Sequence, residues 1–147
     1  DRAVKYADPV AGLPGPIGRV LLTPTRIYVK DVLALTKAVK VKGLAHITGS
    51  GIPGNLPRCL PDGVVAELSA KAWTRAPIFD VLQSFGDVDR AEMYTTFNMG
   101  LGMCAVVSAA DVKPALKLLN DRGVQAWEVG AISAGKAGAE AEAIIGS

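Results

Sequence analysis

The sequence has few of the side chains that most often carry chemistry or hold metals. Its 147 residues include one histidine and two cysteines, with three phenylalanines, three tyrosines and two tryptophans. Cys59 and Cys104 stand in no Cys-X-X-Cys or Cys/His spacing, so no metal site is expected. The pair could form one disulfide, but two buried free thiols are the expected state because cysteine is commonly a core residue.

Charge of one sign and long apolar runs are also scarce. Sixteen Lys and Arg residues nearly balance fourteen Asp and Glu residues, and the net charge is +2. This excludes the strong basic bias typical of a nucleic-acid-binding protein. No apolar stretch approaches the roughly 18–20 residues that span a bilayer, and the first residues lack the pattern of a signal peptide. We therefore expect a cytoplasmic protein with no nucleic acid and no membrane among its partners.

Apolar residues, in contrast, are plentiful enough for a packed core. Half of the residues are hydrophobic and a fifth are charged, and a chain of 147 residues fits one domain. Residues 1–24 hold four of the nine prolines, so we expect an extended linker or arm there, with a short strand at 18–22. Because the first residue is Asp1 and not Met, we expect this arm to lead from a missing N-terminal domain. Residues 25–147 would form the domain itself.

The apolar spacing beyond the arm predicts helices interleaved with short strands. Spacings of three and four predict amphipathic helices, and short alternating or continuous apolar runs predict strands. The expected helices cover 28–39, 78–85, 89–97 and 112–119, and the expected strands cover 44–47, 64–68, 103–107, 126–133 and 141–145. The strand at 103–107 is apolar on both faces, so we expect it to be central. The order indicates an α+β fold, with a mixed sheet covered by helices in an α/β sandwich.

The most informative stretch, residues 46–51, has the sequence His-Ile-Thr-Gly-Ser-Gly. Glycines let backbone N–H groups turn towards a ligand because no Cβ stands in the way. The hydroxyls of Thr48 and Ser50 would add donors, and Arg58 would clamp a phosphate oxygen. The alternative interpretation is an ordinary glycine turn beside a surface arginine.

Two further features have both a functional and a structural interpretation. His46 is a candidate acid/base group because imidazole titrates near neutral pH, but a hydrogen-bonded structural histidine fits the spacing equally well. Asn98 and Gly100 lie where a helix must turn into a strand, and both residue types tolerate the left-handed conformation of a local turn. The functional interpretation places that turn beside the first loop, where Asn98 could donate to a ligand.

Both clusters resemble the signatures of one enzyme family, in the same order along the chain. The matching segments are 22–30, 45–51, 55–58, 60–61, 92–93, 96–100, 102–103 and 127–130. The similarity spans about residues 20–133. The chain therefore resembles the C-terminal domain of the aminoimidazole ribonucleotide synthetases, which are the phosphoribosylformylglycinamidine cyclo-ligases of purine biosynthesis.

The resemblance implies an activity that this chain would share with another domain. In the family, formylglycinamidine ribonucleotide is closed to aminoimidazole ribonucleotide at the expense of ATP, through phosphorylation of the formyl oxygen. The N-terminal ATP-binding domain brings most of the ATP and magnesium site and the homodimer contact. The C-terminal domain covers the cleft and helps to hold the phosphorylated substrate, so residues 1–147 alone would be inactive.

Carried over by position, the resemblance also implies a set of cleft residues. His46 would be the candidate catalytic residue. The substrate- and phosphate-binding residues would be Thr48, Gly49, Ser50, Gly51, Asn55, Arg58, Asn98 and Gly100. The family usually has glycine where Ser50 stands and often glutamate where Gly54 stands. Ser50 can be accommodated if its φ is negative, and we assign no catalytic base to position 54.

Two other functions stay open. The chain could be a non-catalytic, stand-alone binding module with the same fold, or part of a different ATP-dependent member of the superfamily. The coding sequence upstream of Asp1 would distinguish them, because a glycine- and aspartate-rich nucleotide-binding half supports the ligase.

Overall fold

The computed structural model describes residues 4–146, which adopt the expected α+β class. The helices are α1 (Ile17–Leu21), α2 (Val29–Ala38), α3 (Gly51–Asn55), α4 (Pro77–Gly86), α5 (Arg90–Thr96) and α6 (Val112–Asp121). The 3-10 turns are η1 (Leu56–Cys59) and η2 (Ala109–Asp111). The strands are β1 (Gly43–His46), β2 (Val64–Ser69), β3 (Met103–Val106), β4 (Gly130–Ala134) and β5 (Glu142–Gly146). Within residues 4–146 no helix combines the length and the apolarity that a membrane crossing requires.

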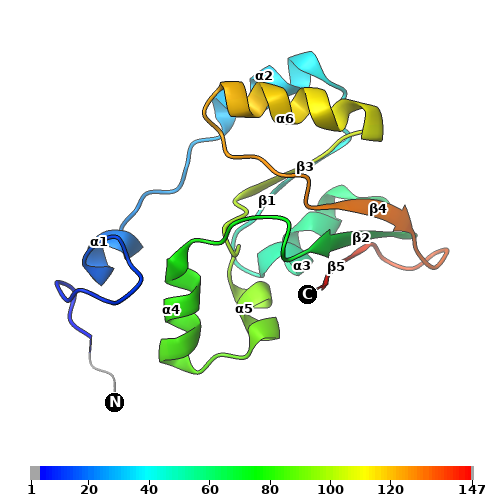
Figure 1. Cartoon of the computed structure of the whole chain (residues 1–147). Coiled ribbons are helices and arrows are strands. Elements are labelled where there is room, and N and C mark those ends of the chain that lie inside the picture. The colour runs from blue at the N-terminus through cyan, green and yellow to red at the C-terminus, as the bar shows by residue number, and fades with distance from the viewer. Residues whose placement is uncertain (1–3, 147) are drawn as a thin grey trace.

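The strands form two small sheets (Figure 1). Strand β2 is the middle of a mixed sheet, because it pairs antiparallel with β4 and parallel with β5. Its sequence suits that place, since Ala66 and Leu68 are buried while Glu67 between them is exposed. Strands β1 and β3 form a separate antiparallel pair in which Ala45 lies opposite Cys104.

Two groups of buried side chains hold the fold together. The larger core joins the strands to α3 and α5, and its most completely buried side chains are Ile47, Ile52, Met93 and Met99. The smaller cluster, built on Leu35, Val39 and Ala115, joins α2 to α6. In Figure 1 these two helices lie side by side, apart from α3, α4 and α5.

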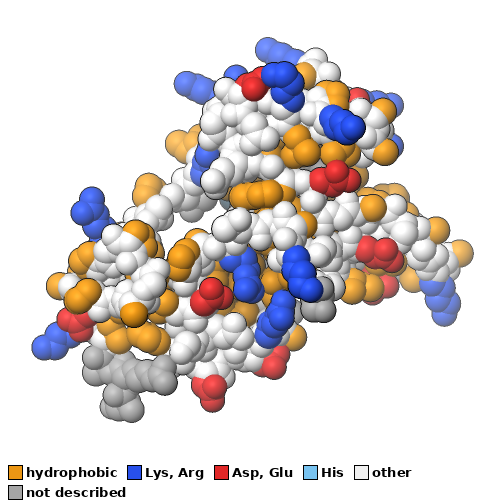
Figure 2. Space-filling view, in the orientation of Figure 1, with side chains coloured by type: hydrophobic (Ala, Val, Ile, Leu, Met, Phe, Trp, Pro, Cys, Tyr) orange, Lys and Arg blue, Asp and Glu red, His pale blue; other side chains and the backbone are white. Residues whose placement is uncertain are grey.

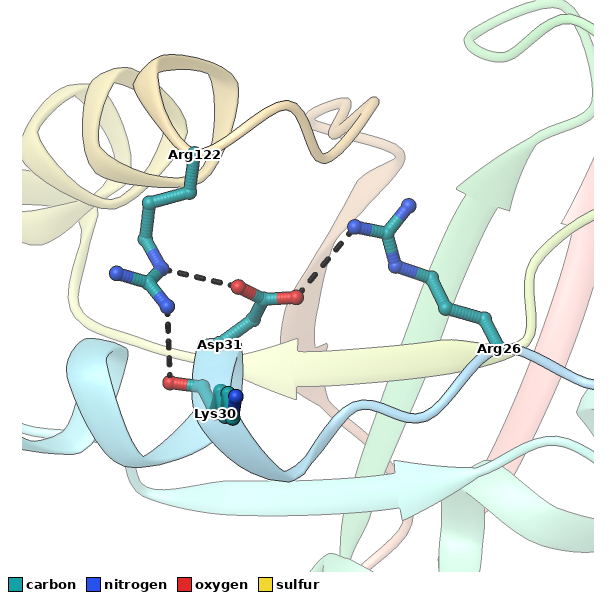
Figure 3. A network of polar contacts seen from close by, with 4 residues as sticks. All are labelled: Arg26, Lys30, Asp31 and Arg122. Atoms are coloured by element: carbon teal, nitrogen blue, oxygen red, sulfur yellow. Dashed lines mark hydrogen bonds and ion pairs between the residues drawn. The ribbon is translucent and has the colours of Figure 1, made fainter.

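A carboxylate fastens α2 to the end of α6 (Figure 3). Asp31 accepts a hydrogen bond from Nε of Arg122 at 2.9 Å and pairs with Arg26 at 3.4 Å. Arg122 also donates to the carbonyl of Lys30 at 3.3 Å. Figure 2 shows Lys and Arg side chains over the outer surface of these helices, which leaves their apolar stripes for the smaller cluster.

The expected strand at 18–22 is wrong, because this part of the arm forms helix α1. Pro16 is the N-cap of α1, with extended backbone at φ −52° and ψ 139°, and no proline follows before Pro24. The intervening residues therefore keep all their N–H donors, and proline at a helix start costs no hydrogen bond. Ile17 and Gly18 are buried, and the Tyr6 ring of the same arm lies against Gly18, so the arm packs on itself around this short helix.

Two strand expectations also need correction. Within the described residues β3 pairs with β1 alone and stops at Val106, so it is not a central strand. An apolar run indicates burial but does not reveal which partner covers it. The strand expected at 126–133 begins only at Gly130, although the carbonyl of Val129 already accepts a hydrogen bond from Ser69 at 2.9 Å.

Candidate functional site

The first candidate loop, residues 48–51, leads from the end of β1 into the first residue of α3 and is anchored at both ends. Ile47 is 1% exposed and its N–H donates to the carbonyl of Gly102 at 2.9 Å, while Ile52 is fully buried. Residues 48–50 between these anchors are exposed. The core therefore holds the ends of the loop and leaves its middle open to solvent, as in binding loops on rigid scaffolds.

The loop turns through two successive left-handed residues. Ser50 has φ 74° and Gly51 has φ 57°. The condition under which Ser50 would fit, a negative φ, is therefore not met, because the chain reverses sharply between β1 and α3. A left-handed conformation costs a residue with a Cβ about 1–2 kcal/mol, so a glycine at position 50 would relieve strain that Ser50 carries.

Asn55 holds this loop from the inside. It is 5% exposed, and its side-chain nitrogen donates to the carbonyls of Gly51 at 2.7 Å and Gly49 at 2.9 Å. A longer contact reaches the carbonyl of Thr48 at 3.5 Å. Its predicted contact with the substrate stays a prediction, but the structure places its amide inside the loop.

The structure brings the first loop against the second cluster. A Cβ on Gly51 would collide with the carbonyl of Tyr94 and approach that of Phe97 to 3.0 Å. Position 51 therefore requires glycine both for its positive φ and for the close approach of α5. The two signature segments, more than forty residues apart in the sequence, share one packed contact.

The second cluster ends in a tight turn at residues 98–101. The carbonyl of Asn98 accepts from Leu101 at 3.0 Å, and both central residues have positive φ, 50° at Met99 and 96° at Gly100. This is the pattern of a type I′ turn. Oδ1 of Asn98 accepts from the Gly100 N–H at 3.0 Å, and Trp73 donates to the Met99 carbonyl at 2.9 Å. A local turn is therefore present, but Met99 and not Asn98 takes the left-handed conformation beside Gly100, and a donation from Asn98 to a ligand stays a prediction.

A cavity of about 660 Å³ lies between the α2–α6 layer and the mixed sheet. Gly100 lines it, together with apolar side chains such as Leu35, Leu119 and Trp127. Residues 48–51 do not line this cavity. The candidate residues at 48–51 therefore lie on an open loop, whereas Gly100 lies on the wall of a separate cavity.

His46 lies exposed at the end of β1, opposite Met103. Its ring meets the ring of Tyr28 edge-on, with centroids 5.8 Å apart. The Tyr28 hydroxyl in turn fills the space beside Gly102 that a larger residue would need. Tyr28 is not among the predicted site residues, although it stands at the start of a predicted helix and within the matching segment 22–30. No carboxylate of residues 4–146 bonds to the imidazole, so an acid/base role for His46 stays a prediction.

Arg58 lies exposed on η1, directly after α3. Within the described part of the chain its guanidinium forms no ion pair, which leaves its charge available to an anion. The same residues contain no group of three His, Cys, Asp or Glu side chains that could hold a metal.

Cys59 and Cys104 are free thiols in this structure. Burial, and to a smaller extent the neighbouring Cys59, raise the pKa of Cys104 to about 11. Desolvation also raises the pKa of Cys59. Both groups are therefore protonated at neutral pH, and a protonated thiol is a poor nucleophile.

Comparison with known proteins finds one family for nearly the whole chain. The profile of the family described as "AIR synthase related protein, C-terminal domain" matches residues 3–141.

Individual relatives agree with that family. The chain is 63% identical over 134 residues to the "Phosphoribosylformylglycinamidine cyclo-ligase" of Myxococcus xanthus (strain DK1622), covering 91% of this chain and 38% of the relative. A protein with the same name from Anaeromyxobacter sp. (strain Fw109-5) is 54% identical over 128 residues, which cover 87% of this chain and 37% of the relative. The chain thus spans little more than a third of the length of these curated relatives.

Proposed function

Because the chain belongs to the family of AIR synthase related proteins, as their C-terminal domain, we propose that it forms one wall of the substrate cleft of a phosphoribosylformylglycinamidine cyclo-ligase. The reaction closes formylglycinamidine ribonucleotide to aminoimidazole ribonucleotide with ATP. High identity to proteins of that name supports this reading. The role that we propose for this domain is substrate binding by its loop at residues 48–51, and not the whole of catalysis.

The loop at residues 48–51 is the proposed binding site of the substrate phosphate. The observation that carries this proposal is its exposed backbone, anchored by buried Ile47 and Ile52. The N–H groups of Gly49 and Ser50 donate no hydrogen bond within residues 4–146. Successive N–H groups next to a left-handed residue form the concavity that binds phosphates and other anions.

Charge for that anion would come from Arg58. Its guanidinium is exposed and free of ion pairs among the described residues. A guanidinium binds phosphate oxygens through charge-assisted and often bidentate hydrogen bonds. Asn98 and Gly100 are proposed to contact another part of the substrate, since Gly100 lines the separate cavity. His46 is the proposed acid/base residue, because it is the one histidine and it is exposed.

The other needs of the reaction would be met by the rest of a longer protein. ATP and magnesium would be bound mostly by an N-terminal domain, which would also make the homodimer contact. The proposed compartment is the cytoplasm, where two free thiols remain reduced. Residues 1–147 alone would then hold the phosphate end of the substrate without turning it over.

Substitutions in the full-length protein test this proposal. Replacing Arg58 with Ala removes charge-assisted hydrogen bonds worth roughly 1.5–3 kcal/mol, so KM for the amidine substrate should rise about 10-fold to 100-fold. Thr48→Ala should raise KM less, because a neutral hydroxyl contributes less. Lys113→Ala, on the exposed side of α6, is the matched control and should behave as the parent. Unchanged KM and kcat in both Arg58→Ala and Thr48→Ala would show that the phosphate binds elsewhere.

A further inference from the structure

Asn55 is the one polar residue in the buried core of the described chain. Its amide nitrogen lies 2.7 Å from the Gly51 carbonyl and 2.9 Å from the Gly49 carbonyl, with Thr48 at 3.5 Å. The orientation of this amide is fixed by chemistry, because carbonyl oxygens accept hydrogen bonds and only the nitrogen donates. An amide nitrogen has two hydrogens, so the short contacts consume both. No donor remains for a ligand.

The same contacts set the direction of the loop's own N–H groups. Because a trans peptide is planar, its C=O and N–H point in opposite directions. Asn55 draws the carbonyls of Thr48 and Gly49 inward. The N–H groups of the next residues, Gly49 and Ser50, must therefore point outward, where residues 48–50 are exposed. Neither N–H has an acceptor within residues 4–146.

We propose that Asn55 is a positioning residue for the phosphate loop: by holding the inward carbonyls it presents the Gly49 and Ser50 N–H groups to the substrate oxyanion. Asn55 itself makes no donor contact with the substrate. The effect on substrate binding rests on the proposed function of the loop, whereas the effect on loop order depends on the contacts above alone.

The first test measures loop order without any ligand. In the full-length protein, Asn55→Ala should speed amide exchange of Gly51 and Gly54, because their N–H groups donate within the loop to Thr48 at 3.1 Å and Ser50 at 3.0 Å. The expected change is about tenfold or more, with peptides from β2 unchanged. Asn120→Ala removes an exposed asparagine from α6 and is the matched control. If Asn55→Ala does not fold, Asn55→Ser keeps one short donor and should give an intermediate increase.

The second test is a double-variant cycle on substrate affinity. If Asn55 acts through the loop, Asn55→Ala should weaken binding, and adding Thr48→Ala should weaken it little further, because the loop is already displaced. If Asn55 touches the substrate, the two fold-changes should multiply.

The two tests separate this inference from the proposed function. Unchanged exchange in Asn55→Ala, or multiplying effects in the cycle, would overturn the positioning role. Faster exchange with unchanged affinity in Asn55→Ala and Thr48→Ala would uphold Asn55 as the residue that orders the loop. It would refute only the phosphate assignment.

Discussion

Ser50 and Gly54 share one space. A Cβ built on Gly54 collides with the Cβ of Ser50, so a side chain at either position excludes one at the other. Ser50 also carries the unfavourable left-handed φ of 74°. The cyclo-ligases that this chain resembles usually have glycine at position 50 and often glutamate at 54. The two departures from that pattern are therefore sterically linked in this structure, because serine at 50 leaves no room for a side chain at 54.

This steric conflict predicts that Ser50→Gly will offset the loss of stability caused by Gly54→Ala. Gly54→Ala should lower the free energy of unfolding by about 1–3 kcal/mol, the usual cost of overpacking. In the Ser50→Gly background the same substitution should be nearly neutral, because the colliding Cβ is gone. Thermal or denaturant unfolding of the four proteins gives the coupling energy directly.

Gly15→Ala is the matched control for that cycle, since a Cβ at Gly15 meets nothing within 4 Å. Its effect should be the same in the parent protein and in the Ser50→Gly background. Equal costs of Gly54→Ala in both backgrounds would mean that the loop shifts to accept both side chains, and the coupling would be refuted.

The spacing of apolar residues predicted most of the helices and strands. The wrong predictions concern features that depend on contacts between distant parts of the chain. The amphipathic spacing around Leu35 and Ala115 correctly gave α2 and α6, because one apolar stripe determines a helix. The same reasoning made the strand at 103–107 central, yet its pairing depends on segments elsewhere in the chain. The clash between positions 50 and 54, and the sign of φ at Ser50, depend on how the chain reverses and could not be read from residue types.

The link from Asp31 to Arg122 should contribute measurably to stability. Asp31 is only 15% exposed and bonds to two arginines from separate segments. Asp31→Asn keeps the shape but removes the charge, and should cost about 1 kcal/mol in urea unfolding, less at high salt. Asp121→Asn is the matched control, because its pair with Lys117 is solvent-exposed on both sides. That control should cost under about 0.5 kcal/mol, and equal costs would contradict the role given to Asp31.

The buried thiol of Cys104 should make stability fall at alkaline pH. Its pKa is raised from 9.0 to about 11, so between these values the unfolded chain loses a proton that the folded chain keeps. Stability from this group is complete below pH 9 and is lost as pH rises towards 11, by about 1–3 kcal/mol. Cys104→Ala should flatten this part of the profile, so the difference in Tm between parent and variant should narrow from about pH 8 to about pH 10.5. A constant difference would contradict the raised pKa.

Replacing Gly51 with Ala should show how much the close approach of the loop to α5 limits the side chain at this position. Gly123 is the matched control, because it also has a positive φ but has no atom near the place of a Cβ. Gly51 has φ 57° and Gly123 has φ 73°. A Cβ at Gly51 would strike the backbone carbonyl of Tyr94, whereas a Cβ at Gly123 would meet nothing within 4 Å. Gly123→Ala should cost about 1–2 kcal/mol from the left-handed conformation alone. Gly51→Ala adds a collision with main chain, which cannot rotate away as a side-chain end can, so its cost should exceed that of Gly123→Ala by about 2 kcal/mol or more. The measurement is urea unfolding of both variants. Equal costs would mean that α5 moves freely away from the loop, and the shared contact between the two signature segments would then be too soft to hold a binding site.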